Sequence, residues 1–375
     1  MTCIENMSRA QITKVLKICY DLFKLNYMNK VIFLFILLFY STNSFSVEAV
    51  KVYQGKNVIW GFDFINKNEI LFTERTGNLF YYNFKTKVLK KLLAPDAHID
   101  GQGGLLDILI DKDTVFLTFS KKNKDTITTA LTRAKLRNKS IHDMQVIFEA
   151  KVKSNTTRHF GSRLVLKDNL IYMTIGDRGE RDYAQDLSVH NGSIIRITKE
   201  GKTPAGNPFI DNEKALSEIW SYGHRNPQGI DIHPITKEIY SCEFGPRGGD
   251  ELNLIKKGVN YGWPIITYGS EYWGPKIGTT HKEGMEQPLK YWVPSISPSG
   301  MVFYRGDKIK GWKNNLFLAN LSSTHLRRLV LEKNNVVEEE SLFKDLKERV
   351  RQVRNSPDGY LYFSTDSGRI YKITP

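Results

Sequence analysis

The chain has 375 residues, of which 41% are hydrophobic, 12% aromatic and 25% charged, and its formal net charge is +14. This composition is typical of a soluble globular protein, and the aromatic share favours a β-rich core. Although the charge would suit a nucleic acid, the basic residues are scattered without a basic helical stripe or a nucleic-acid motif, so we expect no nucleic-acid partner.

The N-terminal region predicts an export signal. Residues Val31–Tyr40 read VIFLFILLFY behind Lys30, and STNSFS follows over Ser41–Ser46. A basic start, a short apolar run and a small-residue exit are typical of a secretory signal peptide, and the run is short for a bilayer span. We therefore predict that residues 1–46 are leader and signal peptide, and that the mature protein is periplasmic or secreted without stable membrane insertion. A buried helix and an uncleaved anchor are the alternatives, and Met28 offers a second start that would make residues 1–27 a mis-called extension.

Cysteine usage agrees with a large, disulfide-free core. Cys3 and Cys19 lie in the predicted leader, so Cys242 alone remains in the predicted mature chain. The leader also holds five Lys/Arg and two Asp/Glu, which leaves about +11 for residues 47–375. A domain of this size can be stable without disulfides even when it is exported.

A repeat runs through residues 47–375. Each copy has a short apolar strand, a polar turn such as DKD or SPDG, and a second strand reading apolar–aromatic–apolar–small. The aromatic anchors of the second strands are Phe72, Phe116, Tyr172, Tyr240, Phe317 and Tyr362, spaced by 44, 56, 68, 77 and 45 residues. A period near 45 residues with inserted loops is typical of four-stranded propeller blades. We predict an all-β, six-bladed β-propeller with four-stranded blades as a single domain over residues 47–375; a β-sandwich is the alternative.

The repeat also predicts where polar side chains meet. In a blade, the residues before the first strand and after the second gather at one mouth of the central channel. The residues before the first strands, 11 to 15 positions ahead of each anchor, are Gln102, His159, Arg225, Asn226, Arg349 and Arg351. An imidazole, two amides and three guanidiniums around one mouth favour a functional pocket.

Each of these residues also has a purely structural interpretation. His159 alone could be a hydrogen-bonded histidine in a turn, Arg349 and Arg351 a solvated strand face, and Gly245-Pro246 a turn. Asp177 and Asp182, in GDRGERD, are interpreted as a solvated loop without a catalytic role.

Several ordered motifs resemble the PQQ-dependent soluble glucose dehydrogenase and aldose sugar dehydrogenase family. They are GQGGLLDI (101–108), HFGSRL (159–164), GHRNPQG (223–229), GPRGGDELN (245–253), NYGWP (260–264), RVRQV (349–353) and SPDGYLYFSTD (356–366). Together they span the chain from about residue 55 to its end. The succession GHRNPQG, GPRGGDELN and NYGWP is the most specific part of the match.

This resemblance implies roles for individual residues. His159 matches the general base for the sugar hydroxyl, with Arg225 as the second catalytic residue. Gln102, Arg225 and Asn226 match contacts to cofactor or substrate, and Arg349 and Arg351 match partners of the PQQ carboxylates. Gly245 and Pro246 match the carbonyl ligands of a catalytic Ca²⁺, and Glu251 with the carbonyl of Tyr261 matches part of a second, structural Ca²⁺ site. Tyr268, Tyr272 and Trp273 fall where family loops wall the sugar pocket.

Two positions depart from the family pattern. Ser322 stands about where the family has a lysine near the cofactor, and Arg327 or Arg328 is displaced from that place, which puts cofactor affinity in doubt. Arg158 precedes His159 where the glucose-specific branch has an acid, so glucose is not assumed to be the substrate.

The sequence therefore predicts an aldose sugar dehydrogenase that uses PQQ and Ca²⁺ and passes electrons to a soluble or membrane acceptor, as a monomer or dimer. His159, with an ordinary pKa near 6.5, would take the hydroxyl proton while hydride passes to the quinone and a lactone forms. Two alternatives remain: a calcium-dependent lactonase on the same fold, and a non-enzymatic propeller that has lost its cofactor.

Overall fold

The computed structural model describes residues 47–375 together with residues 13–14, 16–18, 20–21 and 23–24, which are helical. The predicted signal sequence at 28–46 lies outside the described residues, so the leader remains a prediction. In the described part of the chain, no helix is long and apolar enough to cross a membrane.

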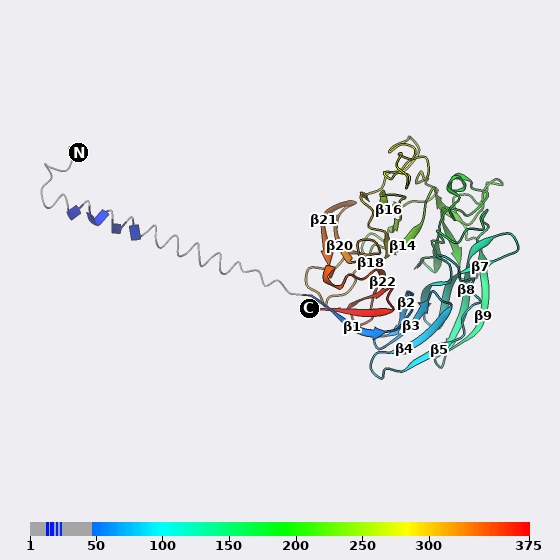
Figure 1. Cartoon of the computed structure of the whole chain (residues 1–375), viewed down its shortest axis with the longest axis horizontal. Coiled ribbons are helices and arrows are strands. Elements are labelled where there is room, and N and C mark those ends of the chain that lie inside the picture. The colour runs from blue at the N-terminus through cyan, green and yellow to red at the C-terminus, as the bar shows by residue number, and fades with distance from the viewer. Residues whose placement is uncertain (1–12, 15, 19, 22, 25–46) are drawn as a thin grey trace. The chain divides into compact units, whose positions relative to one another are not determined.

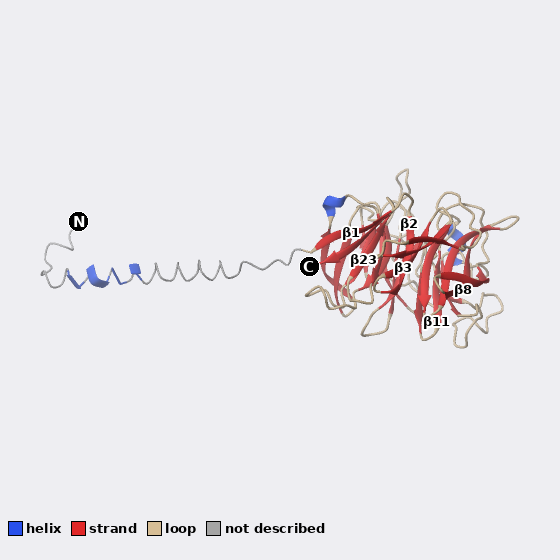
Figure 2. Cartoon of the chain, turned by 90° about the horizontal axis from the view of Figure 1, so that it is seen from below, coloured by secondary structure: helices blue, strands red, loops and turns tan. Residues whose placement is uncertain are grey.

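Residues 47–375 form six four-stranded antiparallel sheets around a common axis, and the prediction of a six-bladed propeller is confirmed (Figures 1 and 2). Blade 1 contains β2 (Ile59–Asn66), β3 (Glu69–Glu74), β4 (Asn78–Asn83) and β5 (Leu89–Leu92). Blade 2 contains β6 (Leu105–Asp111), β7 (Thr114–Lys122), β8 (Ile127–Arg137) and β9 (Ser140–Glu149). Blade 3 contains β10 (Leu164–Lys167), β11 (Leu170–Ile175), β12 (Ser193–Thr198) and β13 (Ile219–Tyr222).

The other three blades follow the same order. Blade 4 contains β14 (Pro227–Ile232), β15 (Ile239–Glu243), β16 (Asp250–Ile255) and β17 (Lys290–Trp292). Blade 5 contains β18 (Pro298–Phe303), β19 (Leu316–Asn320), β20 (Leu326–Glu332) and β21 (Asn335–Leu342). Blade 6 contains β22 (Val350–Asn355), β23 (Leu361–Thr365) and β24 (Arg369–Thr374), and β1 (Glu48–Gln54) completes it from the other end of the domain.

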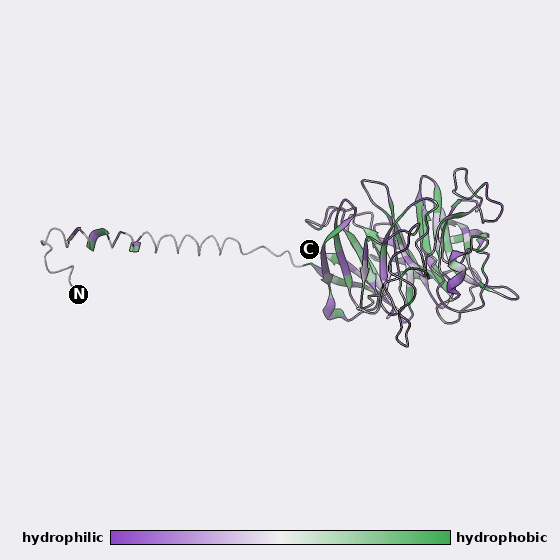
Figure 3. Cartoon of the chain, turned by 90° about the horizontal axis from the view of Figure 1, so that it is seen from above, coloured by the Kyte–Doolittle hydropathy of each residue, from purple (hydrophilic) through white to green (hydrophobic). Residues whose placement is uncertain are grey.

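The six aromatic anchors lie on the second strand of each blade, as the repeat predicts. All six are buried, and they pack in the apolar layers between neighbouring blades. Much of the hydrophobic sequence lies on the strands (Figure 3). The ring closes because β1, from the N-terminal end of the domain, pairs antiparallel with β24 and so covers the edge of β24 that would otherwise be open.

A single arginine joins all six blades at the axis. Arg163, directly before β10 of blade 3, is 2% exposed, and its guanidinium stacks 3.9 Å from the centre of the Trp60 ring. It donates hydrogen bonds to the carbonyls of Trp60 (3.2 Å), Gln228 (2.8 Å) and Arg351 (2.7 Å), to Oδ1 of Asp107 (3.0 Å) and to Oγ of Ser299 (3.4 Å). These partners belong to blades 1, 4, 6, 2 and 5. Arg163 therefore fills the middle of the channel and ties the blades together beneath the mouth where the predicted site lies.

Candidate active site at the mouth of the channel

A cavity of about 410 Å³ opens where the polar residues were predicted to converge. Four of the predicted site residues contribute to its wall: Gln102, His159, Arg225 and Pro246. Its other wall residues are Arg158, Asp177, Gly179, Arg181, Trp263, Glu271, Tyr272, Trp273 and Ile277. The blade topology thus brings together residues more than a hundred positions apart in the sequence.

His159 forms a dyad with a carboxylate that the sequence interpretation had left without a role. Nδ1 of His159 lies 2.6 Å from Oδ1 of Asp177, which is buried directly after β11. The other oxygen of Asp177 accepts a hydrogen bond from Nε1 of Trp263 (2.8 Å). The interpretation of Asp177 as a solvated loop residue was therefore wrong, whereas Asp182 is exposed and stays outside the cavity. The available signal was its position just after a second strand, at the same mouth as His159.

The backbone around His159 also holds the ring in place. His159 adopts a left-handed φ of 55°, and its N–H donates to Oε1 of Gln102 (2.8 Å). The side chain is 12% exposed. A non-glycine residue at positive φ is uncommon and is often found where function requires a fixed geometry.

The electrostatics favour a neutral imidazole paired with an ionised carboxylate. Burial lowers the pKa of His159 and outweighs the opposite effect of Asp177; Arg225 and Arg158 lower it further. Burial alone would raise the pKa of Asp177, but the His159 ring and Arg225 hold it below its ordinary value. With Nδ1–H assigned as the donor to Asp177, Nε2 of His159 keeps a lone pair that can accept a proton.

Arg225 and Asn226 lie at the entrance to β14 with unused hydrogen-bond donors. Arg225 Nη1 donates to the carbonyl of Gly245 (2.7 Å), while its buried Nε has no partner among the described residues. Asn226 is fully buried and accepts from the N–H of Gly161 (3.1 Å), but its Nδ2 is likewise unpartnered. At the end of β19, both polar side-chain atoms of buried Asn320 lack partners. Buried polar groups are normally satisfied, so these unpartnered atoms are candidates for hydrogen bonds to a bound ligand; Arg225 among them lines the cavity.

Arg349 and Arg351 both donate hydrogen bonds to the same carboxylate, that of Asp366. Nε of each donates to Asp366, at 2.9 Å and 2.8 Å respectively. Arg351 also reaches Oε1 of Gln228 on blade 4 (3.5 Å), which places it near the axis, whereas Arg349 is half-exposed. Neither lines the cavity described above. Two guanidiniums against one carboxylate leave one positive charge uncompensated.

The predicted calcium ligands lie on both sides of Arg225. Gly245 and Pro246 are buried at the mouth, where the Gly245 carbonyl already accepts a hydrogen bond from Arg225. Glu251 and Tyr261 line a second, smaller cavity together with Glu243, and Gly245 and Arg225 belong to the same lining. Burial, and then the Glu243 carboxylate, raise the pKa of Glu251 well above its ordinary value. Glu243 is already satisfied in part, because it pairs with His224 (2.9 Å) and accepts hydrogen bonds from the N–H of Arg225 (2.6 Å) and from Nδ2 of Asn253 (3.1 Å). Carboxylate and carbonyl oxygens are the ligands that Ca²⁺ prefers, although the described residues contain no cluster of three His, Cys, Asp or Glu side chains that could hold a metal.

No displaced arginine replaces the missing family lysine. Ser322 is exposed and donates to the carbonyl of Ser295 (3.0 Å). Arg327 and Arg328, on β20, instead form ion pairs with Glu338, Glu339 and Glu340 of β21. Neither arginine lines the cavity, so the departure from the family pattern at Ser322 remains.

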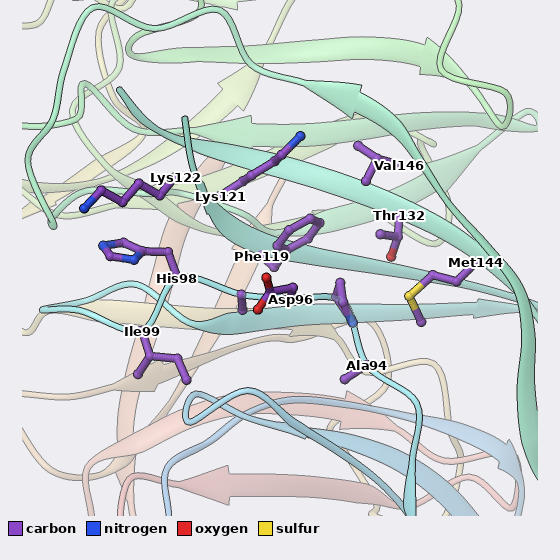
Figure 4. A pocket seen from close by; sticks show the side chains of 12 residues that line it. Ala94, Asp96, His98, Ile99, Phe119, Lys121, Lys122, Thr132, Met144 and Val146 are labelled. Carbon is purple, nitrogen blue, oxygen red and sulfur yellow. The ribbon is translucent and has the colours of Figure 1, made fainter. Parts of the chain in front are cut away.

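The predicted aromatic wall is present only in part. Tyr272 and Trp273 line the cavity and are 67% and 74% exposed. Tyr268 lies outside its lining and stacks on Tyr291, with ring centres 3.7 Å apart. A second cavity, of about 550 Å³, lies beside β7–β9 and the loop after β5 (Figure 4). It contains none of the predicted site residues.

Comparisons with known proteins identify the family of the chain. The sequence profile described as Glucose / Sorbosone dehydrogenase matches residues 56–372. The aldose sugar dehydrogenase YliI of Escherichia coli is 37% identical over 332 residues, covering 84% of this chain and 90% of the relative. Quinoprotein glucose dehydrogenase B of Acinetobacter calcoaceticus is 27% identical over 413 residues, covering 84% of each chain.

Solved structures give the same result. The apo-form of the soluble aldose sugar dehydrogenase from Escherichia coli has a TM-score of 0.84 and 34% identity, covering 88% of this chain and 100% of that one. The PQQ-bound aldose sugar dehydrogenase from Streptomyces coelicolor, at 24% identity and a TM-score of 0.72, covers 88% of this chain and 98% of its own, and shares the fold. The chain belongs to the glucose/sorbosone dehydrogenase family.

Proposed function

We propose that this protein is an exported aldose dehydrogenase that uses PQQ and Ca²⁺ and converts the sugar to its lactone. The observation that carries the proposal is the His159–Asp177 dyad in a cavity whose neighbouring donors on Arg225 and Asn226 are unpartnered. When bound, PQQ with Ca²⁺ would supply the two-electron acceptor for the hydride of the sugar carbon. The family membership supports this assignment.

The protein's own residues have separable tasks in this reaction. Nε2 of His159 removes the proton of the anomeric hydroxyl, and Asp177 orients the ring and stabilises the imidazolium that forms. Arg225 and Asn226 would hold the cofactor through charge-assisted and amide hydrogen bonds, with Arg351 and Arg349 adding positive charge for its carboxylates. The carbonyls of Gly245 and Pro246 would bind the catalytic Ca²⁺, and Glu251 with the Tyr261 carbonyl would bind the structural one.

The activity is tested directly with the purified protein. Mixed with PQQ and CaCl₂, it is expected to oxidise aldoses in the presence of a dye acceptor. Lactone hydrolysis without PQQ would instead support a lactonase. Absence of both PQQ binding and reaction would support a propeller that has lost its cofactor, the outcome that the Ser322 position keeps open.

Replacing Arg225 by methionine is expected to weaken PQQ binding about 10- to 150-fold, because hydrogen bonds to charged groups contribute about 1.5–3 kcal/mol. Turnover should fall with it. The measurement is a PQQ titration of the apoprotein followed by absorbance or tryptophan fluorescence. Arg133→Met, on β8 outside the cavity, is the control. An Arg225→Met variant with the affinity of the unchanged protein would remove Arg225 from the cofactor site.

Calcium is expected to raise the melting temperature, since a ligand at a hundredfold excess over its Kd stabilises the folded state by about 2.7 kcal/mol. Most of the increase at the structural site should disappear in Glu251→Gln, which removes one of the two neighbouring carboxylates that line the smaller cavity. Thermal unfolding with CaCl₂ and with EGTA measures both. Exposed Glu332 gives the matched control, Glu332→Gln. An equal calcium response in Glu251→Gln and the unchanged protein would place the metal elsewhere.

A further inference from the structure

The outer part of the cavity carries an unbalanced positive charge. Arg181 is neutralised by Glu271, with its Nη1 2.7 Å from Oε1. Asp177 is occupied by His159 and Trp263. Arg158 also lines the cavity, yet no carboxylate of the described residues lies within ion-pair distance of its guanidinium. Arg158 is exposed, in contrast to the buried Arg225 deeper in the site.

The surrounding loop holds Arg158 next to the dyad. Its carbonyl accepts a hydrogen bond from Nη1 of buried Arg178. Its side chain lies across Gly179, where a Cβ would come within 2.5 Å of Arg158 Nε and where φ is +75°. The absence of a side chain at position 179 thus leaves the space that the Arg158 side chain fills, two residues from Asp177.

The charge of Arg158 reaches the proposed base. Together with Arg225, it lowers the pKa of His159 beyond the effect of burial. A negative group bound to Arg158 would therefore lie within electrostatic reach of the imidazole that takes the proton. The exposed rings of Tyr272 and Trp273 line the same cavity and offer apolar faces against which a pyranose ring can pack.

We propose that Arg158 selects aldoses that carry an anionic group, a carboxylate or a phosphate, away from the anomeric carbon. This inference rests on the proposed function, because it names the substrate class of the same site. In this arrangement the anomeric hydroxyl faces His159, while the anion lies against Arg158 near the mouth. The unpartnered donors of Arg225 and Asn226 remain for the cofactor.

The test compares D-glucuronate, D-glucose 6-phosphate and D-glucose as substrates of the PQQ- and Ca²⁺-loaded protein. At low salt, kcat/KM for at least one anionic sugar is expected to exceed that for glucose about tenfold or more, as one charge-assisted hydrogen bond allows. The preference should shrink at 0.5 M NaCl. In Arg158→Gln the ratio of anionic to neutral kcat/KM should fall about tenfold, whereas Arg133→Gln, with the same loss of charge outside the cavity, should keep it. The better of the two anions identifies the group as carboxylate or phosphate.

A binding measurement separates this inference from the proposed function. Tryptophan fluorescence of the apoprotein is titrated with each sugar, and tighter binding of an anionic sugar that is lost in Arg158→Gln supports the inference even if no sugar is oxidised. Equal kcat/KM and equal affinity for all three sugars, unaffected by Arg158→Gln, overturn it while leaving the dehydrogenase assignment in place.

Discussion

Replacing His159 by alanine is expected to lower kcat about 10²- to 10⁴-fold, the usual contribution of a general base. The variant should still bind PQQ, because the proposed cofactor donors on Arg225 and Asn226 remain. Steady-state turnover with a dye acceptor and a PQQ titration measure the two effects separately. His98→Ala, in the cavity beside β7–β9, provides a histidine control that should keep its activity. Turnover near that of the unchanged protein in His159→Ala would exclude His159 as the base.

The His159–Asp177 dyad also predicts how kcat/KM depends on pH. Catalysis requires neutral His159, whose pKa burial lowers, so the acid limb of kcat/KM should lie below pH 6.5. Asp177 acts in the opposite direction and raises that pKa. In Asp177→Asn the limb should therefore move to still lower pH, while kcat falls because the ring loses its orienting partner. A limb that moves to higher pH would contradict the dyad as described.

Replacing Arg163 by methionine is expected to lower the free energy of unfolding by about 3–5 kcal/mol, the cost typical of breaking a buried ion pair. Burial lowers the pKa of Arg163 to about 10, so the guanidinium is still charged at neutral pH. Methionine keeps much of the length of the side chain but makes none of the hydrogen bonds of Arg163 to the other five blades. Buried Asp107 is then left with Arg354, 3.5 Å away, as its remaining ion-pair partner.

Urea unfolding of Arg163→Met, Arg163→Lys and Arg133→Met measures this effect. Lysine keeps the positive charge but lacks the planar guanidinium that donates hydrogen bonds in several directions, so Arg163→Lys should restore stability only in part. The Arg133→Met control removes only a partly exposed ion pair with Glu200, so it should change stability by less than about 1 kcal/mol. If the free energy of unfolding falls by less than about 1 kcal/mol in Arg163→Met, the other contacts between the blades are sufficient to stabilise the centre of the propeller without Arg163.

The sequence by itself determined the blade repeat and the mouth of the channel as the place where polar side chains gather around a cavity. The aromatic anchors recur because each second strand must pack between two neighbouring blades, and this local requirement leaves a periodic pattern. His159 and Arg225 could be placed from their distance to an anchor, since every first strand starts at the same mouth.

The tertiary structure alone decided which side chains meet. Asp177 lies 18 positions from His159, and Arg163 takes partners from five other blades, so neither pairing leaves a local pattern. The sharing of Asp366 by Arg349 and Arg351 and the closure of the ring by β1 and β24 are equally invisible in a repeat. Periodicity reports the environment that each blade has in common, whereas contacts across the axis depend on how six different blades face one another.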